Sequence, residues 1–296
     1  MRHVVPLIVP LLFLAASAAG MRAEARAAWL DRVNFYRASA LLPPVVEEPA
    51  LSDAIREHAR YMVRNDRIEH AQNRRLRGAS AGGAAAAAVS NLAGSTRDDE
   101  PDWWAVDVWM QAPFHALGIL DPSLSRVGFG IHRARDGRIQ TAAGLDVLRG
   151  HAVSGAIRFP IVWPADGSTV PLSMHTAEYP SPLTSCDGYR APSGLPLIVQ
   201  MGGGSKVPEV FGSVVIGEAG LVEHCVFTEA TYRNPSSKEQ ALGRAVLDAR
   251  DAIVIIPRHP LRSGATYRIV LEVERERRVE WTFGVAGAVS ATSASR

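Results

Sequence analysis

The sequence predicts an α+β protein in which an N-terminal α-β-α sandwich precedes a β-sandwich domain. Three observations support this: apolar residues repeat at helical spacing in the first half, a hairpin signal follows them, and short β-rich runs fill the second half. With 296 residues and 47% hydrophobic content, the chain is long enough to bury a sizeable core. The length itself favours two domains.

Two amphipathic helices open the first half. In each, apolar residues recur at three- and four-residue steps, so one stripe faces a core. The first stripe holds Trp29, Val33, Tyr36 and Ala40; the second follows Pro49 and holds Leu51, Ile55, His58, Ala59 and Met62. His58 therefore belongs to the buried face, where we expect a hydrogen-bonded core histidine.

A third helical segment runs from Trp103 to Met110 and is broken or restarted at Pro113. Phe114, Leu117 and Leu120 carry its apolar face onward. Before it, residues 82–88 are rich in glycine and alanine, and predict a flexible or weakly helical connection. After it, two runs flank Asp136-Gly137 and predict a β-hairpin: 127–135 and 138–142.

The second half, from about Val153, is predicted to be a β-sandwich spanning 153–287, with a disordered tail at 288–296. Its β-rich runs are 156–162, 195–200, 252–256, 266–274 and 278–285. The last run alternates cleanly and places Val279, Trp281 and Phe283 on one face. The closing residues resemble those of immunoglobulin-like modules on bacterial surface proteins: Pro257, Pro260-Leu261, Gly264, Tyr267, Trp281 and Phe283.

The N-terminus has the pattern of a signal peptide over residues 1–20. Arg2 is followed by an apolar run from Val4 to Ala16 and by small residues, with cleavage expected near Ala18 or Gly20. The run is too short for a comfortable membrane span. We expect a secreted, periplasmic or cell-envelope protein, associated with a membrane only if this segment stays uncleaved.

Cysteine content and net charge bear on disulfide formation and on the class of partner. The two cysteines, Cys186 and Cys225, have no metal-ligand spacing, so in an oxidising compartment we expect a structural disulfide between them. The net charge is only +2, with acidic and basic residues interspersed. Because a nucleic-acid surface needs clustered Lys and Arg, no nucleic-acid partner is expected.

The order of motifs in the first half resembles the CAP superfamily, or SCP domain, which includes cysteine-rich secretory proteins and pathogenesis-related proteins. The resemblance covers residues 29–148 and is strongest to bacterial members. It is carried by Val33-Asn34-Phe35-Tyr36-Arg37, Leu42-Pro43-Pro44-Val45, Ile68-Glu69-His70, Ser90-Asn91-Leu92-Ala93, Trp109 to His115, Asp121-Pro122 and Val127-Gly128-Phe129-Gly130. The α-β-α sandwich is also the fold that this resemblance implies.

The resemblance also implies a cleft. Family members bring two histidines and two acids together there, a set that can hold Zn²⁺. The histidines correspond to His70 and His115, the possible metal ligands, but the acids fall on Ser90 and Ala112. The predicted cleft residues are His70, Ser90, Asn91, Trp109 and His115. Two imidazoles alone make a poor zinc site, and Glu69 and Asp107 are the acids left as substitutes. No other cofactor is predicted.

Three functions compete. The first is an extracellular binding or scaffold module whose ligand is a lipid, a peptide or a cell-wall glycan polymer. The second is a metal-assisted or histidine-based hydrolase of the cell envelope, which the missing acids disfavour; we assign no catalytic residue. The letters Gly78-Ala79-Ser80-Ala81-Gly82 match a nucleophile elbow but lack the preceding strand. The third is a structural or adhesive envelope protein.

Overall fold

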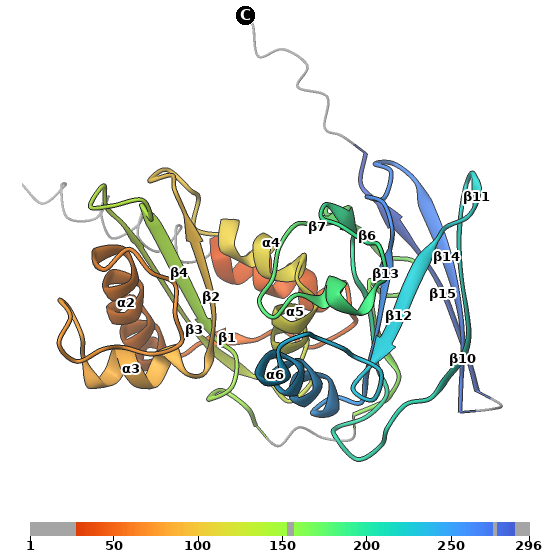
Figure 1. Ribbon diagram of the computed structural model, residues 1–296, viewed down its shortest axis with the longest axis horizontal. Coiled ribbons are helices and arrows are strands. Elements are labelled where there is room, and N and C mark those ends of the chain that lie inside the picture. The colour runs from red at the N-terminus through yellow and green to blue at the C-terminus, as the bar shows by residue number, and fades with distance from the viewer. Residues whose placement is uncertain (1–27, 153–156, 275–276, 288–296) are drawn as a thin grey trace, which may run out of the picture.

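The computed structural model of the chain describes residues 28–152, 157–274 and 277–287. The predicted signal peptide at 1–20 and the predicted tail at 288–296 lie outside these residues. Figure 1 shows the N-terminal helices and sheet at one end of the molecule and the β-rich second half at the other. The chain is α+β, as the sequence predicted.

The first half is a four-stranded sheet between two layers of helices (Figure 1). The strand order is β1 (Val46–Glu47), β3 (Arg126–Arg133), β4 (Thr141–Asp146) and β2 (Ser90–Ser95). Every residue of β4 is buried, because helices cover both faces of the sheet. Ala142 of β4 joins the smaller hydrophobic cluster with Met62, whereas Ala143 and Leu145 join the larger one.

The helical layers contain the helices that periodicity predicted. A helix at residues 28–38 and α2 (Pro49–Arg64) carry the first two apolar stripes. The third segment is divided into α4 (Trp104–Met110) and α5 (Pro113–Ile119), with Pro113 in the first turn of α5, where its missing N–H is harmless. The alanine-rich connection is helical, as α3 (Ala81–Ala87).

Two glycines let α2 lie directly against β3. A Cβ at Gly128 would overlap the backbone of Leu51, and a Cβ at Gly130 would overlap the backbone of Arg56. Phe129, between them, points to the opposite face and stacks on Trp29 with ring centroids 4.8 Å apart. Alternation along one strand therefore assigns a close backbone contact to one face and aromatic packing to the other.

The predicted hairpin was right in its location but wrong in its second strand. Strand β4 begins at Thr141 rather than at Arg138, and Arg133 pairs with Thr141 across a seven-residue connection. The intervening backbone bonds elsewhere: Ile139 N donates to Asp66 Oδ1 at 2.6 Å, and Gln140 N donates to Ser95 O at 2.8 Å. These bonds to α2's end and to β2 replace the tight two-residue turn that Asp136-Gly137 suggested.

The second half contains two larger sheets. One has the order β12 (His224–Thr228), β13 (Ala252–Pro257), β9 (Leu197–Gln200) and β5 (Ile161–Trp163). The other has the order β11 (Gly220–Leu221), β10 (Val210–Gly217), β14 (Thr266–Val273), β15 (Arg277–Val285) and β6 (Thr169–Val170). Val279, Trp281 and Phe283 are all buried on one face of β15, as predicted.

Smaller elements complete this half: β7 (Met174–His175), β8 (Ser193–Gly194), the 3₁₀ helix η1 (Pro182–Ser185) and α6 (Ser237–Asp248). The predicted strand at 156–162 was largely wrong, since Ile157 to Pro160 form no strand and β5 begins at Ile161. Pro160 lacks the N–H that a ladder needs. The sequence analysis did not predict α6.

The two halves share a continuous hydrophobic cluster. Trp163 packs edge-on against Tyr36 at 6.2 Å between ring centroids, and its indole N–H donates to Ser39 Oγ at 3.0 Å. Deeper in, Gln200 Nε2 donates to Leu120 O at 2.9 Å. Aromatic packing and buried hydrogen bonds join the two halves. The second half is therefore packed against the helices of the first half and is not connected to it by a linker alone.

Candidate functional site

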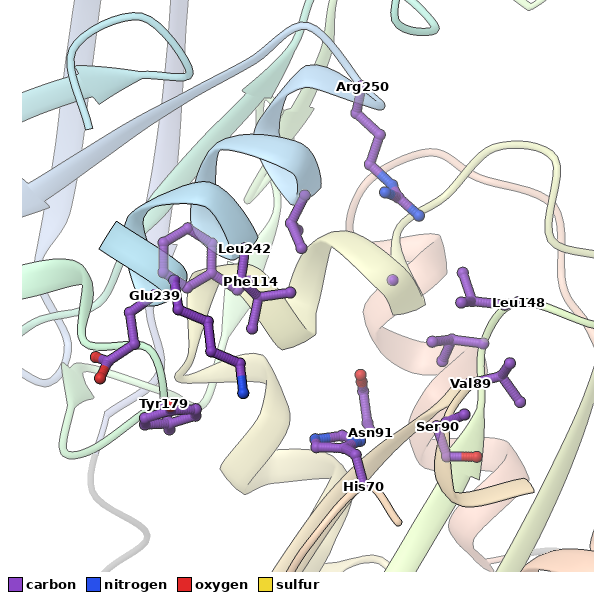
Figure 2. A pocket seen from close by; sticks show the side chains of 15 residues that line it. His70, Val89, Ser90, Asn91, Phe114, Leu148, Tyr179, Glu239, Leu242 and Arg250 are labelled. Carbon is purple, nitrogen blue, oxygen red and sulfur yellow. The ribbon is translucent and has the colours of Figure 1, made fainter. Parts of the chain in front are cut away.

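A cavity lies where α6 of the second half faces β2 and α5 of the first half. Its volume is about 460 Å³. Its apolar wall consists of Val89, Phe114, Val147, Leu148, Leu242 and Val246. Its polar side chains are His70, Ser90, Asn91, Tyr179, Lys238, Glu239 and Arg250. Figure 2 shows His70 and Asn91 together at one side of this space, with Arg250 on the far side of Leu242 and Phe114.

Helix α6 forms one wall of the cavity. Its sequence supplies a cap at the N-terminus of the helix and places the cavity-lining side chains on one helical face. Ser236 is the N-cap, and its hydroxyl accepts from Glu239 N at 3.4 Å, the Ser-x-x-Glu pattern of a capping box. The cavity-lining positions on the helix and just past its end are Lys238, Glu239, Leu242, Val246 and Arg250. These positions recur near every fourth residue and so share one helical face.

Strand β2 supplies two of the predicted cleft residues. Ser90 is buried and donates its hydroxyl hydrogen to Ala86 O at 2.7 Å. Asn91 donates from Nδ2 to His115 O at 3.0 Å. Asn91 thus fixes the backbone of α5 to the sheet at His115, the second of the two histidines that the sequence analysis singled out.

His70 borders the cavity with both of these residues. Its Nδ1 lies 3.0 Å from Ala87 O, a group that only accepts, so Nδ1 carries the hydrogen and Nε2 is the basic nitrogen of the neutral ring. Burial lowers the pKa of His70; the bond to Ala87 opposes this effect, and the charge of His115 adds to it. His70 and His115 are therefore near enough to interact electrostatically.

His115 is paired with an acid from the second half. Glu178 Oε1 accepts from His115 Nδ1 at 2.6 Å and from the backbone N–H of His115 at 2.8 Å. The Glu178 side chain is fully buried, whereas 18% of the His115 side chain remains exposed. With Nδ1 committed to Glu178, the basic nitrogen of the neutral ring is again Nε2. His115 itself does not border the cavity.

Sequence reasoning missed Glu178. It lies 63 residues after His115, in a segment with no motif, so no local signal pairs the two residues. Glu69 and Asp107, the acids that the sequence analysis named as substitutes in the cleft, form hydrogen bonds with other residues. Asp107 binds Arg32 Nε at 2.5 Å and Tyr36 OH at 2.8 Å, and Glu69 accepts from Tyr61 OH at 3.0 Å.

Trp109, the remaining predicted cleft residue, is 1% exposed and belongs to the core beneath the site. It does not border the cavity, and its indole nitrogen has no hydrogen-bond partner among the described residues. Of the five predicted residues, His70, Ser90 and Asn91 line the cavity, whereas His115 and Trp109 do not.

A zinc ion does not fit the donors that the cleft offers. Protein zinc sites use at least three protein ligands. Within residues 28–152, 157–274 and 277–287, no three histidine, cysteine or acidic side chains are grouped to hold a metal. The two imidazoles, His70 and His115, are the donors available here, and Glu178 already receives two hydrogen bonds from His115.

The predicted disulfide joins Cys186 to Cys225, with Cα atoms 5.6 Å apart. Cys186 follows η1 and Cys225 lies in β12, so the bond ties the segment after Glu178 and Tyr179 to the sheet. The disulfide thus anchors the chain shortly after Glu178, the hydrogen-bond partner of His115.

The nucleophile-elbow letters have a structural explanation. Ser80 is the N-cap of α3, where its hydroxyl accepts from Gly83 N at 3.0 Å and donates to Glu57 Oε2 at 2.6 Å. Turns rather than a strand precede it. Its hydroxyl is used to begin a helix.

No helix in the described part of the chain is long and apolar enough to cross a membrane.

Comparison with known proteins gives a family for the first half. No curated protein matches the chain. Among solved structures, CopC from Methylosinus trichosporium OB3b is 12% identical with a TM-score of 0.22, over 44% of this chain and 94% of that chain. A likeness this weak supports no conclusion about fold or function. Residues 30–143 match the family model described as "Cysteine-rich secretory protein family", or CAP. These residues therefore form a CAP domain, as the motif order predicted.

Proposed function

We propose that this CAP-domain protein is exported and binds a small amphiphilic molecule in the cavity between its CAP domain and α6. The single observation that carries the proposal is the apolar wall of a cavity of about 460 Å³, with polar side chains at its margins. Cavities of this size and lining suit drug-sized and lipid-sized ligands. Export is supported by the signal-peptide pattern and by the disulfide.

Among the three ligand classes, the lipid class fits best. A peptide or a glycan polymer would bring many polar groups that need partners, whereas the wall offers mainly Val, Leu and Phe side chains. Helix α6 and the segment of Tyr179 also border the space. We therefore expect a single apolar chain to enter rather than a long polymer to lie across the surface.

The test is calorimetric titration of the mature protein with 12-carbon amphiphiles below their critical micelle concentrations. Val246→Glu places a charge in the apolar wall and should weaken binding at least about ten-fold. Ala245→Glu is the matched control, because Ala245 is exposed on the same helix and does not border the cavity. Equal affinities for both variants, or no binding by the parent protein, would count against a lipid-binding cavity and favour the adhesive or scaffold function.

A histidine-based hydrolase is the second candidate, because the His115–Glu178 pair resembles the base and its orienting acid in general-base catalysis. It predicts turnover of p-nitrophenyl dodecanoate that disappears in His115→Gln and persists in Ser80→Ala. Turnover that is unchanged by His115→Gln removes this candidate.

A further inference from the structure

The two larger sheets of the second half present the edges of β10 and β12 on the same side of the molecule. Strand β10 is bonded to β14 in one sheet, and β12 is bonded to β13 in the other. The two edges meet beside β11, where Val222 N donates to Val215 O at 2.8 Å. Beyond this point no ladder joins β10 to β12 among the described residues. Figure 1 shows the two strands separating as they leave β11, so the sandwich is open along this side.

Side chains close the gap near β11. Ser213 Oγ lies 2.8 Å from His224 Nε2, and His224 Nδ1 lies 2.8 Å from Val222 O. Because a carbonyl oxygen only accepts, Nδ1 carries the hydrogen, and Nε2 accepts from the hydroxyl of Ser213. Farther along β10, the register with β14 shifts between Val210 and Gly212, an irregularity that bends a strand. The gap is therefore bridged at one end and open at the other.

Main-chain hydrogen-bonding groups of both strands face this gap. Glu223 O accepts from Arg258 N at 2.8 Å, so the main chain of Glu223 bonds toward β13. Since the bonding direction alternates along an antiparallel strand, the N–H and C=O of Val226 face the other way, toward β10. On β10, alternation from Val215 turns the N–H and C=O of Ser213 toward β12. Such edge groups are a template for a further strand.

A groove of about 460 Å³ lies between the separated strands, and we call it the edge groove. Its lining residues come from the β10 and β12 segments: Val207, Pro208, Glu209, Val210, Phe211, Val226, Phe227, Thr228, Ala230 and Thr231. Val207 and Phe211 are large apolar side chains that are 60% and 51% exposed. Glu209 is the only charged residue of this lining set. The edge groove therefore combines an apolar wall with a single acid.

These features together indicate an extended peptide as the occupant. Strand edges are satisfied by a partner that brings its own main-chain donors and acceptors, which neither an acyl chain nor a glycan has in the required spacing. Every second side chain of an added strand would enter the apolar space, where β-branched residues pack well. A basic residue of the peptide would complement Glu209.

We propose that the edge groove binds an extended segment of a partner polypeptide as an added strand between β10 and β12. Alternate apolar side chains of this segment lie between the two sheets, and a basic residue lies against Glu209. The inference goes beyond the lipid-binding function and does not depend on it.

The test is fluorescence polarisation with the labelled peptide Lys-Val-Thr-Val-Thr-Val. The parent protein should bind this peptide saturably. Binding should be at least about ten-fold weaker for the same peptide with N-methylated Val and Thr residues, because that peptide has lost its main-chain donors. In the complex with the unmodified peptide, hydrogen exchange of the Val226 amide should slow by about ten-fold or more.

Two matched variants of β10 locate the binding surface. Phe211→Lys places a cation on the edge groove and should weaken binding of the peptide by at least about ten-fold. Val214→Lys is the control, because Val214 is an exposed apolar residue of the same strand that does not line the edge groove. Glu209→Lys tests the charge separately: it should reverse the preference between the Lys peptide and its counterpart that begins with Glu.

Several outcomes would overturn the proposal. These are no binding by the parent protein, equal binding of the N-methylated peptide, and equal losses in Phe211→Lys and Val214→Lys. Tighter peptide binding after removal of residues 288–296 would identify the chain's own C-terminus as the occupant. A parent protein that dimerises while Phe211→Lys stays monomeric would identify a second copy.

The lipid-binding function is tested separately. Val246→Glu, which places a charge in the wall of the other cavity, should leave peptide binding unchanged. Loss of peptide binding in this variant would overturn the edge groove as the binding site.

Discussion

The carboxylate of Glu178 receives two hydrogen bonds from one residue, His115: one from the ring Nδ1 at 2.6 Å and one from the backbone N–H at 2.8 Å. His115 lies in the first turn of α5, where backbone N–H groups have no partner within the helix. Glu178 therefore caps a helix of the CAP domain and orients the side chain of His115 at the same time. In this chain the two acid positions of the family pattern hold Ser90 and Ala112, and the carboxylate beside His115 comes from the second half.

Replacing Glu178 should loosen the attachment of the two halves. Glu178→Ala leaves two donors of His115 without an acceptor, and we expect the free energy of unfolding to fall by about 2–4 kcal/mol. Glu178→Gln retains Oε1 as an acceptor and should cost less than half as much. Chemical denaturation followed by tryptophan fluorescence measures both. Equal losses for the two variants would show that charge, rather than the acceptor, matters at this position.

Arg37 should be among the most sensitive positions in the CAP domain. It is fully buried, and its guanidinium donates to the carbonyls of Pro43, Ile119, Asp121 and Leu124 at 2.7–3.1 Å. Burial lowers the pKa of Arg37 to about 10, and Asp121 opposes this shift. Lysine cannot reach all four acceptors from one point.

We therefore expect Arg37→Lys to reduce the free energy of unfolding by about 3–5 kcal/mol. Arg56→Lys, at an exposed ion pair with Asp53, should change it by no more than about 0.5 kcal/mol. Urea denaturation of the two variants checks this. A small effect at Arg37 would mean that the carbonyls are readily satisfied by water.

Stability should fall as the pH drops through about 6.5, the ordinary pKa of histidine. Burial lowers the pKa values of His58, His70 and His132 in the folded protein. The unfolded chain therefore binds protons at a higher pH than the folded chain does. Stability is full above the unfolded pKa and is lost as the pH falls below it. Denaturation midpoints between pH 8 and pH 5 measure this loss.

His58 allows a sharper test. Its Nε2 donates to Glu69 O at 3.0 Å, and its Nδ1 accepts from Gln72 Nε2 at 3.0 Å. The amide orientation is fixed because Gln72 Oε1 accepts from Ser80 N at 2.8 Å. A proton on Nδ1 would meet the amide N–H. Gln72→Glu supplies an acceptor instead, so it should raise the pKa of His58 and flatten the loss of stability below pH 6.5. An unchanged pH profile would assign the dependence to other groups.

Opening the disulfide should destabilise the second half. The bond between Cys186 and Cys225 closes a loop with a sequence separation of 39. The chain-entropy model gives a loss of about 3–4 kcal/mol for a loop of this length. Cys186→Ser/Cys225→Ser should match the reduced parent protein in guanidinium denaturation, and reductant should not affect the double variant. A loss that is confined to one of the two preparations would contradict the loop-closure explanation.

The sequence by itself determined the elements that depend on local spacing. Apolar steps of three and four residues located the helix at 28–38 and α2, and alternation located β15 with its buried Val279, Trp281 and Phe283. Motif order identified the CAP domain, and two cysteines without metal-ligand spacing predicted their disulfide. Each of these conclusions follows from residues whose neighbours in sequence share their environment, or from a pattern that is itself linear.

Only the tertiary structure decided what surrounds the cleft. Glu178 reaches His115, and Arg250 reaches Asp121, across long stretches of chain with no periodic signal to pair them. The connection between β3 and β4 is longer than predicted for the same reason. The backbone N–H groups of Ile139 and Gln140 donate to Asp66 and Ser95 instead of forming a tight hairpin. Hydrogen bonds between distant segments depend on how the two halves pack, and a local pattern carries no information about that packing.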